Sequence, residues 1–141
     1  CEYYAKEYGI NIVIMRLGNV YGPNGKGVIN QFVKNLKNNQ NLEVTGTGSQ
    51  LRNYVYINDI INCIAAYYIE FNNWLDFECF DVARPWQHSI HTIIYELSQL
   101  TKQPITIKFL PFIKEIENSK IQNTNCDISL KEGIEKLWNE R

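Results

Sequence analysis

The sequence has no strong charge imbalance and no long hydrophobic run. Its 14 Lys and Arg residues nearly balance its 15 Asp and Glu residues, which gives a formal net charge of -1. A nucleic-acid-binding domain usually carries a positive surplus, so we expect no nucleic-acid partner. No apolar run approaches the ~20 residues that span a bilayer, and no basic stretch followed by an apolar one opens the chain as a secretory signal does. We therefore expect no membrane segment and a cytoplasmic protein.

Paired metal-ligating residues are also missing. The chain has four cysteines, none spaced as C-x-x-C, and two histidines, His88 and His91, that stand near none of them in sequence. A structural zinc site needs clustered ligands, so the sequence predicts no metal site. The two histidines can share one helix face, but no carboxylate or thiol has a matching spacing, and we interpret them as surface residues. The cysteines are interpreted as free buried thiols in a reducing compartment, although the sequence leaves a disulfide open.

What the sequence does contain is an alternation of strand-like and helix-like segments. With 141 residues, 45% of them hydrophobic and 21% charged, it has the size and composition of one globular domain. Apolar or alternating runs predict strands at 10–17, 42–45, 52–57, 77–82 and 105–110. Apolar residues at helical spacing predict helices at 1–8, 28–39, about 59–71, 90–100 and from 130 onward. The order predicts an α/β fold built from βα units around a parallel sheet.

Residues that end helices support these boundaries. Gly9 predicts a left-handed end to the first helix, and Ser89 and Ser129 predict N-caps of the last two. Asn58 or Asp59 is the expected cap of the third helix, whose inward stripe is predicted from its apolar positions: Ile60, Ile61, Ile64, Ala65 and Tyr68. The runs at 12–15 and 77–82 predict strands buried on both faces, as in a parallel sheet.

The functional interpretation depends on residues 16–23, Arg-Leu-Gly-Asn-Val-Tyr-Gly-Pro, which follow the first strand. The chain becomes polar and glycine-rich there, at the carboxyl end of a strand, where open α/β sheets bind ligands. Arg16 and Asn19 can present a charge and an amide to an anion. The glycines at 22–27 lack the spacing of a phosphate-binding loop, so we interpret that segment as a connector.

Two segments resemble the extended short-chain dehydrogenase/reductases, which include the NAD-dependent nucleotide-sugar epimerases, dehydratases and decarboxylases. Residues 16–23 are similar to the family pattern R-x-x-N-x-Y-G-P, and residues 42–60 to l-x-v-x-G-x-G-x-Q-x-R-d-y-v-y-v-x-D-v. The resemblance implies that residues 1–141 are the C-terminal portion of an NAD-dependent epimerase/dehydratase domain. That portion would hold the last strands of a Rossmann-type parallel sheet, interleaved with a small mixed α/β substrate-binding domain. The chain begins with Cys1 inside a helix, so we expect the dinucleotide-binding half to be absent from it.

The resemblance also implies binding residues. Asn19 and Arg52 match the family residues that hold the diphosphate of a nucleotide sugar, and a guanidinium fork suits two phosphate oxygens better than a Lys amine does. The other implied positions are Val28 and Val44 at the pocket for the nucleotide base, and Leu17 and Gly18 near the nicotinamide of NAD. Each of these residues also has a plainer interpretation as a turn, surface, core or packing residue. No metal site is implied.

The family's acid/base pair comes from a Y-x-x-x-K motif, which this chain lacks. Glu7 stands four residues after Tyr3, and Tyr8 four residues after Tyr4. We therefore assign no catalytic residue and expect the chain alone not to transfer hydride. The resemblance implies NAD as the cofactor of the complete protein, a nucleotide-diphosphate sugar as the ligand, and a homodimer formed through helices that include the first. Arg16, Tyr21 and Asp59 are expected to be structural.

The last third departs from the family pattern. Residues 81–85 lack both glycines of the common N-x-G-x-G, and residues 110–115 lack the usual Arg, for which Arg84 or Lys114 can substitute. The L-G-W-x-P element before the last helix is missing. These departures leave two further hypotheses open. One is a non-catalytic relative that holds a nucleotide sugar or a partner protein without redox chemistry, and the other is a remnant that does not fold alone.

Overall fold

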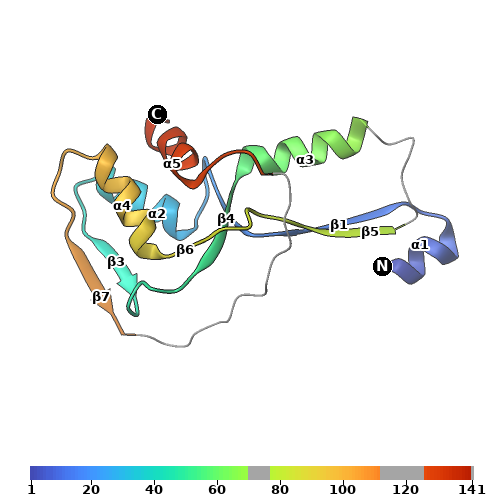
Figure 1. The fold of residues 1–141 in the computed structure, drawn as a ribbon, viewed down its shortest axis with the longest axis horizontal. Helices are drawn as coiled ribbons and strands as arrows, with labels where there is room; N and C mark the ends of the chain where they lie inside the picture. The colour runs from blue at the N-terminus through green and yellow to red at the C-terminus, as the bar shows by residue number, and fades with distance from the viewer. Residues whose placement is uncertain (70–76, 112–125, 141) are drawn as a thin grey trace.

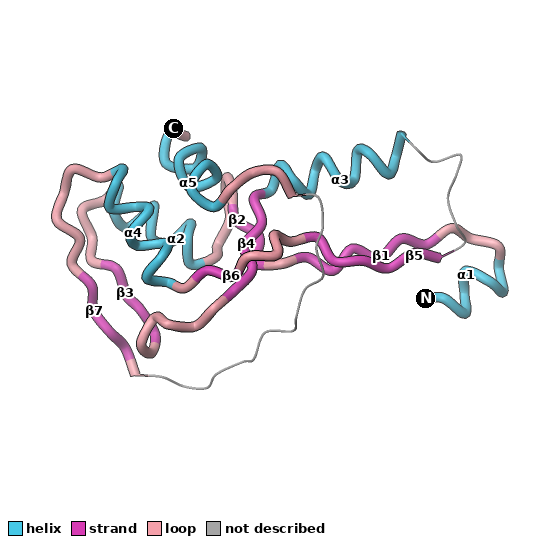
Figure 2. The backbone as a smooth tube through the Cα atoms, in the orientation of Figure 1, coloured by secondary structure: helices cyan, strands magenta, loops and turns pink. Residues whose placement is uncertain are grey.

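The computed structural model describes residues 1–69, 77–111 and 126–140 of the chain. Its elements are α1 (Glu2–Tyr8), β1 (Ile12–Leu17), β2 (Asn19–Tyr21), α2 (Val28–Lys37), β3 (Leu42–Thr45), β4 (Arg52–Tyr56), α3 (Ile57–Ile69), β5 (Phe77–Val82), β6 (Gln87–His88), α4 (Ile90–Leu100), β7 (Ile107–Leu110) and α5 (Leu130–Asn139). Figures 1 and 2 show an elongated molecule, with α1 and the β1–β5 ribbon at one end and α2, α4, β3 and β7 at the other. The alternation of strands and helices confirms the predicted α/β class.

The described strands form three small sheets. β1 pairs with β5 in parallel, from Ile12 opposite Phe77 to Leu17 opposite Val82. β4 lies between β2, its parallel neighbour, and β6, its antiparallel neighbour, while β3 pairs with β7 in parallel. β1 and β2 are separated only by Gly18, yet they belong to different sheets. The chain therefore crosses at Gly18 from the β1–β5 ribbon into the sheet that carries the candidate site.

The main hydrophobic core joins α2, α4 and α5 to the tyrosines of β2 and β4. The buried residues of α2 recur at helical spacing, which gives this helix one apolar face: Ile29, Phe32, Val33 and Leu36. Ser89 and Ser129 cap α4 and α5 by accepting bonds from the backbone N–H groups three residues later, as predicted. Gly9 ends α1 in the left-handed conformation, with φ 61° and ψ 34°, also as predicted.

The expected cap of the third helix is wrong. α3 begins at Ile57, so Asp59 lies inside its first turn. The Asp59 Oδ1 instead accepts bonds from the backbone N–H groups of Asp127 and Ile128, at 3.2 and 3.3 Å. These residues are 68 and 69 positions away in sequence, so a local pattern cannot reveal the contact. Asp59 thus has a structural role, as expected, but it joins α3 to the segment before α5.

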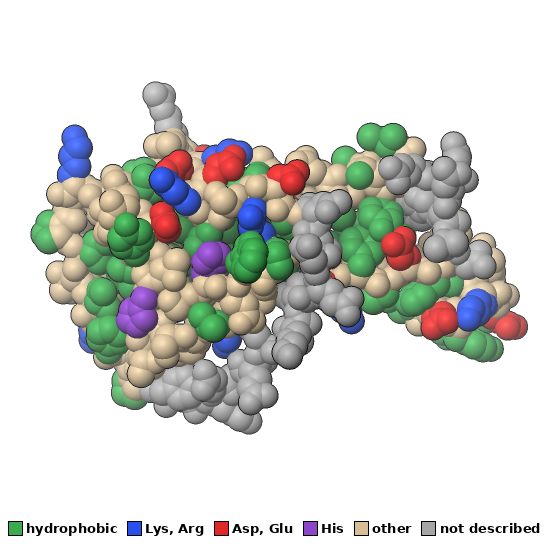
Figure 3. Space-filling model, viewed as in Figure 1, with side chains coloured by type: hydrophobic (Ala, Val, Ile, Leu, Met, Phe, Trp, Pro, Cys, Tyr) green, Lys and Arg blue, Asp and Glu red, His purple; other side chains and the backbone are tan. Residues whose placement is uncertain are grey.

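β1 and β5 are less buried than predicted. Residues 12–15 are half-buried, Leu17 is 47% exposed, and in β5 only Asp81 and Val82 are buried. Of the predicted stripe of α3, only Ile60 is buried, and the other four residues are exposed. Among the described residues β1 pairs with β5 alone, so these apolar segments have no covering layer on their outer side. Figure 3 shows hydrophobic side chains reaching the surface at this end of the molecule.

Two short strands were not predicted. β2 falls where the sequence indicates a turn from residue 19 onward, and β6 has only two residues, Gln87 and His88. Both segments are too short to show the alternation of apolar and polar residues that predicts a strand. They are strands because they pair with β4. The expected end of the third helix at residue 71 and Lys114, a proposed substitute for the missing Arg, lie outside the described residues.

The four cysteines are free, as interpreted, but only Cys126 is buried. Cys63 is half-buried, and Cys1 and Cys79 are exposed. Within residues 1–69, 77–111 and 126–140, His, Cys, Asp and Glu side chains form no cluster of three that fits a metal ion. Each helix in the same ranges falls short of the length and hydrophobicity that a bilayer crossing requires.

Candidate ligand-binding site

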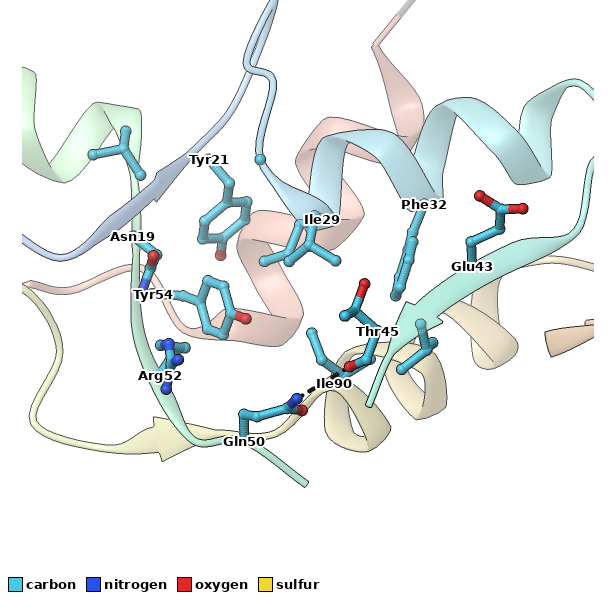
Figure 4. Close-up of a pocket in the computed structure, with 14 residues that line it drawn as sticks. Asn19, Tyr21, Ile29, Phe32, Glu43, Thr45, Gln50, Arg52, Tyr54 and Ile90 are labelled. Atoms are coloured by element: carbon cyan, nitrogen blue, oxygen red, sulfur yellow. Dashed lines mark hydrogen bonds between the residues drawn. The ribbon is translucent and has the colours of Figure 1, made fainter. Parts of the chain in front are cut away.

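A cavity of about 470 Å³ opens between the β2–β4–β6 sheet and the layer formed by α2, β3 and the start of α4. Figure 4 shows Asn19, Arg52 and Tyr54 on the sheet side, across the cavity from Thr45 and Phe32. The register explains the sheet side. Asn19 pairs with Tyr54, and residues two apart on a strand face the same way, so all three polar side chains share one face.

The two polar groups expected to hold a diphosphate both donate a hydrogen bond to the backbone. Arg52 donates from Nη1 to the carbonyl of Leu51 at 2.8 Å, and Asn19 donates from Nδ2 to the carbonyl of Asn53 at 3.3 Å. A guanidinium carries five N–H donors in a planar fork, a geometry that suits two phosphate oxygens. The Asn19 bond also explains the orientation of its amide, which is fixed by β4 rather than by its own turn.

The N-terminus of α2 forms a second wall. Gly27 is its N-cap, with φ −70° and ψ 172°, and it offers no side chain to bond the first backbone N–H groups of the helix. Gly27, Val28 and Ile29 all border the cavity. The first N–H groups of a helix have no intrahelical acceptor and carry a partial positive charge, which suits an anion. The cavity thus combines a guanidinium and an uncapped helix start.

The structure brings four of the six residues implied by the resemblance into one cavity wall: Asn19, Val28, Val44 and Arg52. Val44 is also a core residue, which agrees with its plainer interpretation. The other two, Leu17 and Gly18, do not border this cavity. Their position at the crossing from β1 to β2 puts them beside the β1–β5 ribbon.

Gly18 is enclosed by the chain itself. A Cβ at this position would lie 2.7 Å from the Ala83 Cβ and 2.9 Å from the Asn53 carbonyl oxygen. The Gly18 N–H donates to the Val82 carbonyl at 3.0 Å. The space on the Cβ side of Gly18 is therefore filled by protein. Contacts of Leu17 and Gly18 with NAD stay predictions.

Sequence reasoning did not single out several residues of the wall. Gln50 donates from Nε2 to the Thr45 carbonyl at 3.0 Å, while its Oε1 is buried with no hydrogen-bond partner among the described residues. Gln50 belongs to the G-x-G-x-Q-x-R segment, and Tyr54 stands two residues after Arg52, so both had a signal in the sequence. Burial raises the pKa of Tyr54 to about 12, against the opposite effect of Arg52, so its hydroxyl stays protonated near neutral pH.

Other charged groups near the site are engaged elsewhere. Glu43, which borders the cavity, pairs with Lys108 across β3 and β7 at 3.3 Å. Arg16 joins Asp81 at 2.7 Å and so links β1 to β5, consistent with its expected structural role. Arg84 does not border the cavity, and its Nη1 donates to the Cys126 carbonyl at 3.0 Å.

Comparison with known proteins identifies the family. Residues 1–82 match the model of the NAD dependent epimerase/dehydratase family, and the chain belongs to that family. It is 28% identical to a putative UDP-glucose 4-epimerase of Methanocaldococcus jannaschii, over 96% of this chain and 47% of that protein. It is 30% identical to a UDP-N-acetyl-alpha-D-glucosaminuronate decarboxylase of Bacillus cytotoxicus, over 94% of this chain and 42% of that protein.

Solved structures confirm the Rossmann-type fold class. The Bacillus cereus UDP-glucuronic acid 4-epimerase, in complex with UDP-glucuronic acid and NAD, matches 99% of this chain and 48% of its own, with a TM-score of 0.82 and 26% identity. A UDP-glucose 4-epimerase of Thermus thermophilus in complex with NAD matches in fold, with a TM-score of 0.80, 20% identity, and coverage of 96% and 47%. The chain spans less than half the length of these proteins.

Proposed function

We propose that this chain is the substrate-binding half of an NAD-dependent nucleotide-sugar epimerase or dehydratase. The observation that carries the proposal is the pairing of Arg52 and Asn19 with the uncapped N-terminus of α2 in one cavity. A diphosphate needs donors on more than one side, and a guanidinium fork with backbone N–H groups supplies them. The apolar part of the wall, with Val28 and Val44, is the proposed place of the nucleotide base.

The proposed role of the chain alone is binding. An acid/base step needs a group whose pKa lies near the working pH, and Tyr54 in the cavity wall has a pKa of about 12. The sequence contains no Y-x-x-x-K. In the complete protein, the residues of this chain would hold and orient the sugar nucleotide, and a bound NAD would supply the redox chemistry.

Calorimetric titration of the 141-residue chain with UDP-glucose and with dTDP-glucose tests the proposal. We expect binding of at least one of them, and Arg52→Ala to weaken it by roughly 10- to 150-fold, because hydrogen bonds to a charged group contribute about 1.5–3 kcal/mol. Arg52→Lys keeps the charge but lacks the planar guanidinium fork, so its affinity should lie between those of the wild type and Arg52→Ala. Lys34→Ala, on the exposed face of α2, is the control and should bind like the wild type. Equal affinity of Arg52→Ala and the wild type would overturn the assignment.

The alternative is a binding module without redox chemistry. It would use the same cavity as the enzyme but would not use NAD. It is favoured by Ala83 and Pro85, which replace the glycines of N-x-G-x-G. Sequencing upstream of Cys1 in the source genome separates the two hypotheses. A glycine-rich turn and a Y-x-x-x-K there support the enzyme, and their absence supports the binding module. A cytoplasmic location is part of either proposal, since four free cysteines suit a reducing compartment.

A homodimer is proposed on the surface of α1. Tyr3, Tyr4 and Tyr8 are 67%, 56% and 65% exposed, which is unusual for three aromatic side chains on one short helix. Sedimentation equilibrium of the chain measures the association directly. Replacement of all three tyrosines by Ser should shift a dimer to a monomer, and an unchanged mass would contradict the proposed surface.

A further inference from the structure

His88 stands directly opposite Arg52 in the sheet. β6 pairs with β4 in antiparallel fashion, and the register puts Arg52 across from His88 and Asn53 across from Gln87. Directly opposed residues of an antiparallel pair point to the same face, with Cβ atoms roughly 4.5–5.5 Å apart. Because the Arg52 side chain borders the cavity, His88 lies on the same face of the sheet, at the β6 edge and next to the residues that border the cavity rather than among them.

The surroundings of His88 are mainly positive. Arg52 faces it from β4, Arg84 lies near it after the end of β5, and Glu96 of α4 has the opposite electrostatic effect. Burial and the Arg84 guanidinium lower the pKa of His88, and Glu96 acts in the other direction. α4 begins at Ile90, so the positive end of that helix also lies next to this residue. The half-buried imidazole of His88 makes no side-chain hydrogen bond within the part of the chain that the structure describes.

We propose that His88 is a second anion-binding group of the nucleotide-sugar site and takes up a proton when a diphosphate binds beside Arg52. This inference rests on the proposed function, since it requires the diphosphate at Arg52. A diphosphate diester carries two negative charges, which outweigh the repulsion from Arg52 and Arg84 and favour the imidazolium. The proton comes from solvent, and the imidazolium then donates an N–H to a phosphate oxygen.

Linkage fixes the sign of the effect. If the complex binds a proton more tightly than the free protein does, affinity rises as the pH falls through the range between the two pKa values of His88. One proton changes the affinity by at most about tenfold per pH unit. A histidine with a purely structural role would give no proton uptake on binding.

His91 supplies a matched control. It is the other histidine of the chain, it is exposed on α4, and a Cβ on Gly48 would lie 3.3 Å from its ring atoms. It is not paired with Arg52. Figure 3 shows that both imidazoles reach the same face of the molecule. His91→Gln therefore removes the other imidazole of the chain without changing the residue opposite Arg52.

The test is calorimetry of UDP-glucose binding to the 141-residue chain at about pH 6 and about pH 8, in two buffers with different ionisation enthalpies. The diphosphate diester of UDP-glucose does not titrate in this range, so any proton exchanged belongs to the protein. We expect wild type and His91→Gln to take up a fraction of a proton and to bind several-fold more tightly at the lower pH. We expect His88→Gln to lose both effects while retaining its thermal unfolding transition.

The outcomes separate the two proposals. If Arg52→Ala loses binding while His88→Gln keeps the proton uptake, the inference about His88 is wrong and the proposed function stands. If His88→Gln weakens binding equally at both pH values and the wild type takes up no proton, the role of His88 is structural and the inference is again wrong. If the folded wild-type chain binds neither UDP-glucose nor dTDP-glucose, the proposed function fails and the inference fails with it.

Discussion

A Cβ on Gly18 would lie 2.7 Å from the Cβ of Ala83, well inside the contact distance of two carbon atoms. Gly18 is the residue at which the chain leaves the β1–β5 ribbon and enters the β2–β4–β6 sheet, and Ala83 directly follows β5. The two sheets therefore meet where only a glycine fits. The alanine at 83, which replaces a glycine of the family pattern, makes this contact tighter.

Gly18→Ala should destabilise the fold by about 1–3 kcal/mol, the usual range for an overpacked interior position. Urea unfolding followed by circular dichroism measures the change. Adding Ala83→Gly should restore part of the loss but not all of it, because the Asn53 carbonyl still lies 2.9 Å from the new Cβ. A Gly18→Ala protein as stable as the wild type would show that the two sheets can separate at no cost.

At a second glycine, Gly133, we expect the usual preference of a helix for Ala over Gly to be reversed. Gly133 lies inside α5, where Ala normally stabilises by about 1 kcal/mol. Here the Tyr21 hydroxyl occupies the place of a Cβ, and the ring Cζ would lie 2.8 Å from it. Gly133→Ala should therefore destabilise the protein. In a Tyr21→Phe background the loss should be smaller, since the hydroxyl is gone, and a double-mutant cycle measures the difference. Additive losses would contradict the contact.

The link between α3 and the segment before α5 predicts a local change in hydrogen exchange. Asp59→Ala removes the acceptor of two backbone N–H groups, one of them on buried Ile128, at a cost of about 1–3 kcal/mol for each group left unsatisfied. The amides of Asp127 and Ile128 should lose protection, while amides of α2 should keep theirs. Asp59→Asn retains an acceptor oxygen and should preserve part of the protection. Equal exchange at these amides in all three proteins would rule out the link.

Asp59 also predicts a pH dependence of stability. Burial raises its pKa above the usual 3.8, although the two backbone N–H groups act in the opposite direction. The folded state then holds a proton on Asp59 more tightly than the unfolded chain does. Protonated Asp59 therefore stabilises the fold at low pH, and this stabilisation is lost as the pH rises from about 3.8 through the raised pKa of the folded state. The wild type should therefore lose stability relative to Asp59→Asn over that interval. If the wild type instead gained stability relative to Asp59→Asn as the pH rose, the fold would stabilise the ionised carboxylate.

Features set by local chemistry could be predicted from the sequence. Gly9 ends α1, and Ser89 and Ser129 begin α4 and α5, because a left-handed glycine and an N-cap hydroxyl act within one helical turn. The gathering of Asn19 and Arg52 at one cavity followed from two ordered motifs. Their binding role is still a prediction.

Features set by contacts between distant segments could not be predicted. The two residues of β6 become a strand only through pairing with β4, and Asp59 finds its partners far along the chain. The apolar stripe of α3 has a correct period but no covering layer among the described residues, so Ile61 and Ile64 are more than half exposed. Periodicity predicts which side chains share a face, but what covers that face depends on the rest of the molecule.

Every described residue of the cavity wall falls between Asn19 and Ile90. The groups that would recognise a ligand therefore lie together in one continuous stretch of the chain. Recombination can move such a stretch between genes without separating residues that must act together. If the proposed function holds, recognition of the ligand is inherited as one segment of the chain that begins just after the crossing at Gly18.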